Sequence, residues 1–214
     1  MSFSTSYQKG EPRKTVRLFS LISHLLDIQK KYGDIELFYS DIFGQPRLLK
    51  VPEIRVKTAK VYYRRSMLGK YQIKCVSDEM ALLDDTFKNC IQSTSFRSIV
   101  IHAISDNLPQ TRFIYHISSL VAELRCFFNV VGNLSVMFQI PNGYMIPLLR
   151  SQIQPMILYQ ETRYLHPKQK KKNGVLVEYR SEKQKSIIGT LVSKPFKGCM
   201  FISDCVYHDW EEYL

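Results

Sequence analysis

The stretch Pro52-Glu53-Ile54-Arg55-Val56-Lys57-Thr58-Ala59-Lys60-Val61-Tyr62-Tyr63 alternates along its whole length. Ile54 and Val56 fall on one side of an extended chain, and Arg55 and Lys57 fall on the other. Because successive side chains of a strand point to opposite faces, this pattern predicts a β-strand with basic outward positions. Residues 71–76 are a second short run and are expected to be its hairpin partner across 67–70.

Helices are predicted on either side of this hairpin. Thr15 is expected to cap a helix over residues 16–32 that ends at Gly33. A second helix is expected behind Ser77-Asp78-Glu79, and a third over residues 96–105. The apolar face of the first helix comprises Leu18, Ile22 and Leu25 with Phe19 and Leu26, and that of the second comprises Met80, Leu83, Phe87 and Ile91.

Strands dominate the expected second half. Residues 127–140 resemble a strand pair bent at Gly132, and 147–173 are expected to be irregular because they contain three prolines and a lysine tract. Further strands are expected at 174–179, 187–192 and 199–204. No internal repeat is evident. The order predicts an α+β fold: a single compact domain over 15–214 with a twisted antiparallel sheet packed against helices, an irregular basic loop around 141–173, and a flexible basic N-terminal arm over 1–14.

The positive charge is concentrated. The 214 residues carry a net charge of +11. Residues 47–74 hold nine Lys or Arg against one acid, and residues 163–197 hold ten against two. A concentrated positive field implies an extended polyanionic partner, which can be nucleic acid, a ribonucleoprotein or an anionic lipid surface. The residues predicted to bind membrane or polyanion are Lys9, Arg13, Lys14, Arg17, Lys168, Lys170, Lys171 and Lys172.

Catalytic chemistry has little support in the sequence. There is no phosphate-binding glycine loop, nucleophile elbow or zinc-protease motif. The candidate acid, base or ligand residues are Asp84, Asp85, His102, His116 and the cluster Asp204, Cys205, His208 and Asp209, and none stands in a specific motif. We therefore expect no enzyme activity, no cofactor and no metal.

The five cysteines form no CxxC pair, which favours a reducing compartment. The most apolar stretch, residues 117–140, is interrupted by polar side chains, so a peripheral rather than a membrane-spanning protein is expected.

Three stretches resemble the vesiculovirus-like matrix proteins of rhabdoviruses. Residues 188–204, Ile-Gly-Thr-Leu-Val-Ser-Lys-Pro-Phe-Lys-Gly-Cys-Met-Phe-Ile-Ser-Asp, resemble the closing hairpin of that family. Ser77-Asp78 with the segment 96–108 is similar to its central helices and the loop after them, and Phe128-Asn129-Val130 leading to Phe138 is similar to its Phe-Asn strand entry.

The resemblance implies a structural protein of the virion, located beneath the envelope, in the host cytoplasm and on the inner face of the host membrane. Its implied partners are anionic inner-leaflet lipid, the viral nucleocapsid, further copies of the chain and the tail of the viral glycoprotein. Its role would be to condense the nucleocapsid during assembly and budding. The family loop after the central helices corresponds here to residues 108–124, so the resemblance implies self-association through Leu108, Phe113, Ile114, Leu120 and Val121.

Two departures and two alternatives remain open. The arm contains no Pro-Pro-x-Tyr or Pro-Thr/Ser-Ala-Pro motif, and Asp78-Glu79-Met80 only mimics the acidic-flanked methionine of some family members. The same basic blocks would also serve a nucleic-acid-binding protein, in which Tyr62-Tyr63-Arg64-Arg65 could stack on bases. An enzyme with an unrecognised site is the remote alternative.

Overall fold

The structure is a computed structural model. It describes residues 9, 11–12, 14–41, 43–50, 52–65, 71–77, 90–104, 114–141, 145–164, 175–181, 191–192 and 194–202.

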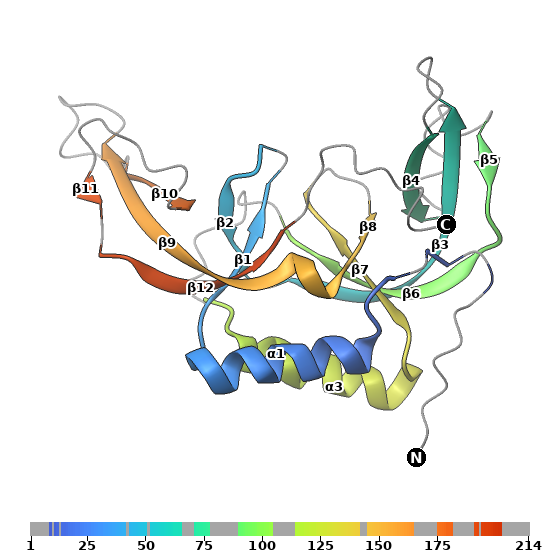
Figure 1. Ribbon diagram of the computed structural model, residues 1–214, viewed down its shortest axis with the longest axis horizontal. Helices are drawn as coiled ribbons and strands as arrows, with labels where there is room; N and C mark the ends of the chain where they lie inside the picture. Colours follow the sequence, from blue (N-terminus) through green and yellow to red (C-terminus); the bar gives the residue numbers. More distant parts are fainter. Residues whose placement is uncertain are drawn as a thin grey trace.

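The chain folds as two successive sets of elements, each beginning with a helix (Figure 1). The first set is α1 (Leu18–Tyr32), β1 (Leu37–Ser40), β2 (Pro46–Leu48), β3 (Glu53–Arg65), β4 (Tyr71–Ser77), β5 (Ile91–Gln92) and β6 (Phe96–His102). The second is α3 (Ile117–Val131), β7 (Ser135–Gln139), β8 (Met145–Pro147), the 3-10 turn η2 (Arg150–Gln152), β9 (Ile153–Tyr164), β10 (Val175–Ser181), β11 (Leu191–Val192) and β12 (Phe196–Phe201). The predicted α+β class is confirmed.

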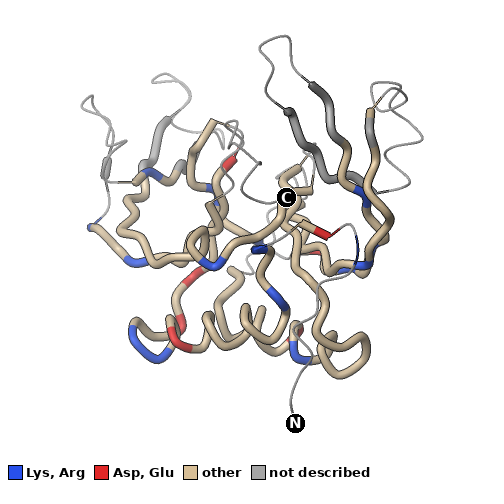
Figure 2. Tube along the Cα trace, turned by 45° about the vertical axis from the view of Figure 1, so that its right-hand side comes forward, with Lys and Arg blue, Asp and Glu red and all other residues tan. Residues whose placement is uncertain are grey.

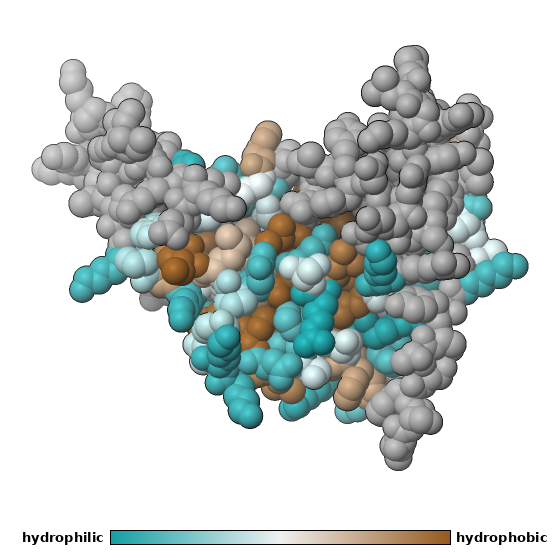
Figure 3. Space-filling view, in the orientation of Figure 1, coloured by the Kyte–Doolittle hydropathy of each residue, from teal (hydrophilic) through white to brown (hydrophobic). Residues whose placement is uncertain are grey.

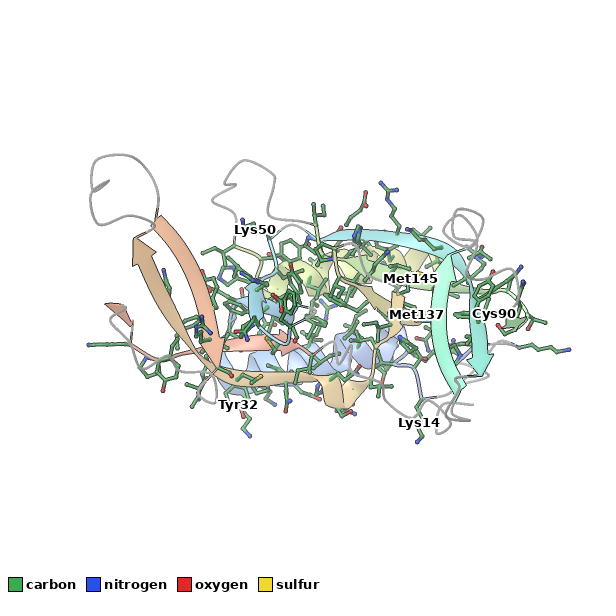
Figure 4. The ribbon with its side chains drawn as sticks, turned by 90° about the horizontal axis from the view of Figure 1, so that it is seen from above. Lys14, Tyr32, Lys50, Cys90, Met137 and Met145 are labelled. Carbon is green, nitrogen blue, oxygen red and sulfur yellow. The ribbon has the colours of Figure 1, made fainter. Side chains whose placement is uncertain are left out.

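The strands form two curled sheets. One has the order β10-β9-β12-β1-β2, with β11 also on β9, and the other has the order β4-β8-β7-β6-β3-β5. Most pairs are antiparallel, but β1 with β12 and β6 with β7 are parallel. In the second sheet β4 also pairs with β3, so the ring β3-β6-β7-β8-β4 closes at Cys75 and Met145. Met137 and Met145 lie near one another in Figure 4 and belong to the buried cluster of this ring.

The two sets are an internal repeat, contrary to the expectation from sequence. Adding 99 to a residue number takes Leu21 to Leu120, Leu25 to Leu124, Gly33 to Gly132, Leu49 to Leu148 and Ile54 to Ile153. In the last strand of each set the offset is 100, so that Phe96 corresponds to Phe196. The order matches element by element: α1 with α3, β1 with β7, β2 with β8, β3 with β9, β4 with β10, β5 with β11 and β6 with β12. A repeat of one supersecondary unit therefore organises the whole fold.

The two halves complete each other's sheets. β1 of the first half pairs with β12 of the second, with Leu37 opposite Cys199, and β6 of the first pairs with β7 of the second, with Ile99 opposite Val136. Backbone bonds between the halves are also matched: the Leu18 N–H donates to the Leu134 carbonyl, and the Ile117 N–H donates to the Ile35 carbonyl. Such reciprocal contacts are those of a twofold dimer, here within one chain.

The helices lie side by side beneath the sheets and supply the main core (Figure 1). Leu18, Leu21 and Leu25 of α1 are fully buried, as are their counterparts Ile117, Leu120 and Leu124 of α3. Each helix ends at a glycine with positive φ, Gly33 at 86° and Gly132 at 78°. Glycine adopts this conformation without the penalty that a Cβ brings, so both helices stop at equivalent points.

Several predicted elements are confirmed. The β3–β4 hairpin, the strand at β10 and the helix before Gly33 are present. That helix begins at Leu18 rather than Val16, because Arg17 is its N-cap and the Thr15 hydroxyl donates instead to the Pro12 carbonyl. Phe19 is 50% exposed and does not join the buried face.

Other predictions are wrong. Residues 96–102 form the strand β6, not a helix, and Ile91 lies in β5. Phe127 belongs to α3, so the expected strand pair at 127–140 is a helix end followed by β7. The stretch 147–164, expected to be irregular, contains β9. The rest of the helix expected behind Ser77 lies outside the described residues.

Part of the stretch predicted to be a flexible arm belongs to the folded body. Glu11, Thr15 and Val16 are buried, and the Val16 N–H donates to the Leu148 carbonyl. The Val16 carbonyl in turn accepts from the Val136 N–H. Residues 11–17 therefore belong to the folded body where the structure describes them.

Candidate polyanion-binding surface

The two basic blocks overlap at equivalent hairpins of the two halves, although they begin and end at different positions of the repeat: residues 163–197 correspond to residues 64–97. Residues 47–74 span β2, β3 and most of β4, and residues 163–197 span the end of β9, all of β10 and β11 and the start of β12. The hairpins β3–β4 and β9–β10 both project to the side of the molecule away from the helices (Figure 1). The repeat thus places two basic hairpins on one side.

Described cations lie along the strands that lead to these hairpins (Figure 2). The Arg55 side chain is largely exposed on β3 and pairs with Glu53. Arg97 on β6 and Lys197 on β12 are both exposed and occupy equivalent positions, opposite Thr58 and Ile157 respectively. Arg97 and Lys197 were not among the residues predicted as sites, and only the repeat, which sequence reading missed, could have related them.

A histidine paired with the start of β3 has a shifted pKa. His102 lies opposite Glu53 in the sheet, and its Nδ1 is 3.7 Å from a Glu53 carboxylate oxygen. The pKa of His102 is nevertheless lowered from 6.5, chiefly by burial and then by the charge of Lys57. The protonated, positively charged form of His102 is therefore disfavoured.

The residues predicted to bind polyanions from the N-terminal arm differ in exposure and in ion pairing. Lys9 and Lys14 are exposed, and Figure 4 places Lys14 at the end of the helix layer where α1 begins, far from Tyr32. Arg17 instead pairs with Glu11 at 3.1 Å, and the two side chains are only 13% and 0% exposed. Arg17 therefore stabilises the fold and does not serve as a polyanion contact. Binding a phosphate instead would break the buried pair and leave the Glu11 charge uncompensated. Arg13 lies outside the described residues.

The lysine tract and part of the predicted self-association segment also lie outside the described residues: Lys168, Lys170, Lys171, Lys172, Leu108 and Phe113. Ile114 is 42% exposed. Leu120 and Val121 are buried on α3 against their own core, so their prediction as docking residues is wrong. The pattern that suggested an apolar loop is the inner face of an amphipathic helix.

Of the weaker chemical candidates, the structure describes His102 and His116, and these lie on different elements. His102 is on β6, whereas His116 precedes α3 and its Nδ1 lies 3.1 Å from the Ile114 carbonyl. Asp84, Asp85, Asp204, Cys205, His208 and Asp209 lie outside the described residues. In the part of the chain that the structure describes, no three His, Cys, Asp or Glu side chains are grouped as a metal site requires.

Burial raises the pKa of Cys199 to about 12, so this thiol is kept in its unreactive form. No helix within the described ranges is both long and apolar enough to cross a bilayer.

Comparison of the whole chain with family models, with curated proteins and with solved structures found no match in any of the three.

Proposed function

We propose that this chain is a non-enzymatic structural protein of viral matrix type. It binds anionic membrane through its N-terminal cations, contacts the nucleocapsid through its basic hairpins, and assembles with further copies of itself. The observation that carries the proposal is that the two basic blocks overlap at equivalent hairpins, β3–β4 and β9–β10, which project to one side.

Two hairpins on one side suit an extended polyanion better than a compact ligand. Each half contributes nine or ten Lys or Arg in its block, against one or two acids. Phosphate contacts add with each counterion released, so two similar hairpins on one strand of nucleic acid bind more tightly than either alone. Lys9 and Lys14 are exposed, and Figure 4 places Lys14 near the start of α1, at the helix layer, whereas the hairpins project away from the helices. A separate membrane contact is therefore compatible with a bound nucleocapsid.

The nucleocapsid contact is tested with single-stranded RNA in a salt titration. Arg64→Gln/Arg65→Gln removes two cations from the first hairpin, and Lys170→Gln/Lys171→Gln removes two from the second block. Each pair should weaken binding and reduce the slope of log affinity against log salt by about 1.4, since each phosphate that a cation no longer neutralises reduces it by roughly 0.7. The control Lys30→Gln/Lys31→Gln removes two exposed cations from the last turn of α1 and should leave the slope unchanged.

The membrane contact is tested with vesicles of phosphatidylserine and phosphatidylcholine. Lys9→Gln/Lys14→Gln should weaken binding roughly tenfold or more at low salt, since each cation near an anionic leaflet contributes about 1 kcal/mol. Binding of RNA but not of vesicles by the unmodified chain would favour the nucleic-acid-binding alternative. Binding of neither would reject both.

A further inference from the structure

The two ends of the helix layer are built alike but have different surfaces. At one end the Phe19 N–H donates to Oδ1 of Asn133 at 2.9 Å. At the other, the equivalent Ser118 N–H donates to Oδ1 of Asp34 at 2.8 Å. The backbone interaction is therefore the same at both ends, and only the side chains distinguish them.

The end formed by the start of α1 and the last turn of α3 is apolar. Phe19 is 50% exposed and Val130 is 82% exposed. The Phe19 ring packs on Phe128, with 6.0 Å between the ring centroids. Figure 3 shows hydrophobic atoms at this end of the helix layer, at the lower right of the described surface. We call Phe19, Phe128 and Val130 the apolar tip.

The opposite end is polar at each equivalent position. Ser118, Gln29 and Lys31 replace Phe19, Phe128 and Val130. The Ser118 hydroxyl donates to Asp34 at 2.6 Å, and the Gln29 amide donates to the same carboxylate at 3.2 Å. The fold thus accommodates a polar set at this site, so packing alone does not require the exposed aromatic and aliphatic side chains of the apolar tip.

Charge around the apolar tip favours an anionic partner. The acid Asp34 of the polar end is replaced by the neutral Asn133 at the tip. The exposed Lys14 precedes α1 by four residues. Lys197 lies with its Nζ 4.8 Å from the ring of Tyr32, the last residue of α1. In the repeat, the exposed Arg97 corresponds to Lys197, and Val131, the last residue of α3, corresponds to Tyr32.

We infer that the apolar tip inserts into the headgroup region of an anionic bilayer, with the neighbouring cations on lipid phosphates and carboxylates. Binding at a membrane interface grows with the apolar area that is buried and with electrostatic attraction to anionic lipids, and the apolar tip with its neighbouring cations can supply both. This inference rests on the proposed membrane role and adds a hydrophobic contact to the electrostatic one.

The decisive variant is Phe19→Ser/Val130→Gln in the full chain. Phe19→Ser introduces the residue that the other half has at the equivalent position, Ser118. The variant should therefore keep the secondary structure seen by circular dichroism and its affinity for RNA. Vesicles containing phosphatidylserine should bind it at least about tenfold more weakly at high salt, because burial of apolar surface is not screened. It should also lose the rise in surface pressure when added beneath a phosphatidylserine monolayer.

The matched control is Phe43→Ser, which removes a 76% exposed phenylalanine from the turn between β1 and β2, on the side away from the helices. This control should bind and insert as the unmodified chain does. Val130→Gln alone, at a highly exposed helix end, gives a second variant whose folding is not at risk and should show a smaller loss in the same direction.

Three results would overturn the inference. The tip variant could bind and insert like the control while Lys9→Gln/Lys14→Gln still loses affinity, in which case the proposed membrane role stands and the tip has no part in it. The tip variant could change sedimentation of the free protein with vesicle binding unaltered, in which case the tip contacts a second copy. Absence of vesicle binding by the unmodified chain would remove both proposals.

Discussion

At the scale of single residues, the two halves act as controls for each other. Gly198 on β12 is equivalent to Ser98 on β6, and Phe38 on β1 is equivalent to Met137 on β7. A Cβ added to Gly198 would lie 2.7 Å from the Phe38 ring and 2.8 Å from Leu158. In the other half the equivalent serine is fully buried, and the smaller Met137 and Ala59 take the places of Phe38 and Leu158. Gly198 on β12 and Phe38 on the neighbouring strand β1 are therefore complementary in size.

Gly198→Ala should lower the free energy of unfolding by about 1 to 3 kcal/mol, because overpacking forces neighbouring side chains off their rotamers. Combining it with Phe38→Met, which copies Met137, should return part of that loss, although Phe38→Met alone is destabilising. Urea unfolding of the three variants forms a double-mutant cycle that measures the coupling. Additive losses would show that the close approach to the Phe38 ring is relieved in some other way.

The lowered pKa of His102 predicts a pH-dependent stability. The folded pKa lies below 6.5, mainly through burial and then through Lys57, so the unfolded chain binds the proton at a higher pH than the folded chain. Stability from this group is complete above pH 6.5 and is lost as the pH falls through 6.5 towards the folded pKa. His102→Gln should flatten this decline in thermal melts between neutral and mildly acidic pH. An unchanged pH profile in the variant would assign the decline to other groups.

At the scale of elements, hydrophobic periodicity predicts a helix or strand correctly where one face of the element is buried and turn-forming residues mark its ends. It predicted α1 up to Gly33, and it predicted the β3–β4 hairpin. It failed for β6, where Ile99, Val100 and Ile101 are all buried and no alternation exists to read. The β-branched side chains there favour a strand, and that preference outweighed the helical spacing.

Proline misled the prediction for β9. Pro155 lies opposite Cys199 of β12, whereas β10 pairs with β9 only from Leu158 to Tyr164. Among the described strands, β12 is therefore the one partner of β9 at Pro155, so the missing N–H removes no bond to another described strand. The position of a strand within a sheet decides whether proline is tolerated, and composition alone does not reveal that position.

The candidate site could be predicted only in part, because composition does not reveal where a residue lies in the fold. Counting charges identified both basic blocks, since net charge needs no knowledge of the fold. It also counted Arg17 as available, although Glu11 folds back to pair with it. The apolar tip was missed because Phe19 and Phe128 are far apart in the sequence and meet only when α1 and α3 pack side by side.

At the scale of the whole molecule, the repeat escaped notice because identities at the 99-residue spacing are scattered. What persists is the apolar framework, such as Leu21 with Leu120, and the helix-ending glycines Gly33 and Gly132. Exposed positions have diverged, as Lys31 and Val130 illustrate. Such divergence is expected when a duplicated unit keeps its core and its two surfaces take different roles.

Because each sheet contains strands from both halves, the halves should remain together after the chain between them is cut. We expect a chain with a site-specific protease sequence inserted after Asp106, once folded and cleaved, to elute as a single species of unchanged size. The parallel pairs β1 with β12 and β6 with β7 hold the fragments by backbone bonds, and α1 packs on α3. In urea the cut protein should unfold in one transition, with a midpoint that now depends on protein concentration, since unfolding releases two chains. Fragments that separate in native buffer, or two independent transitions in either protein, would show that each half completes its own sheet and that the exchange between halves does not hold the fold together.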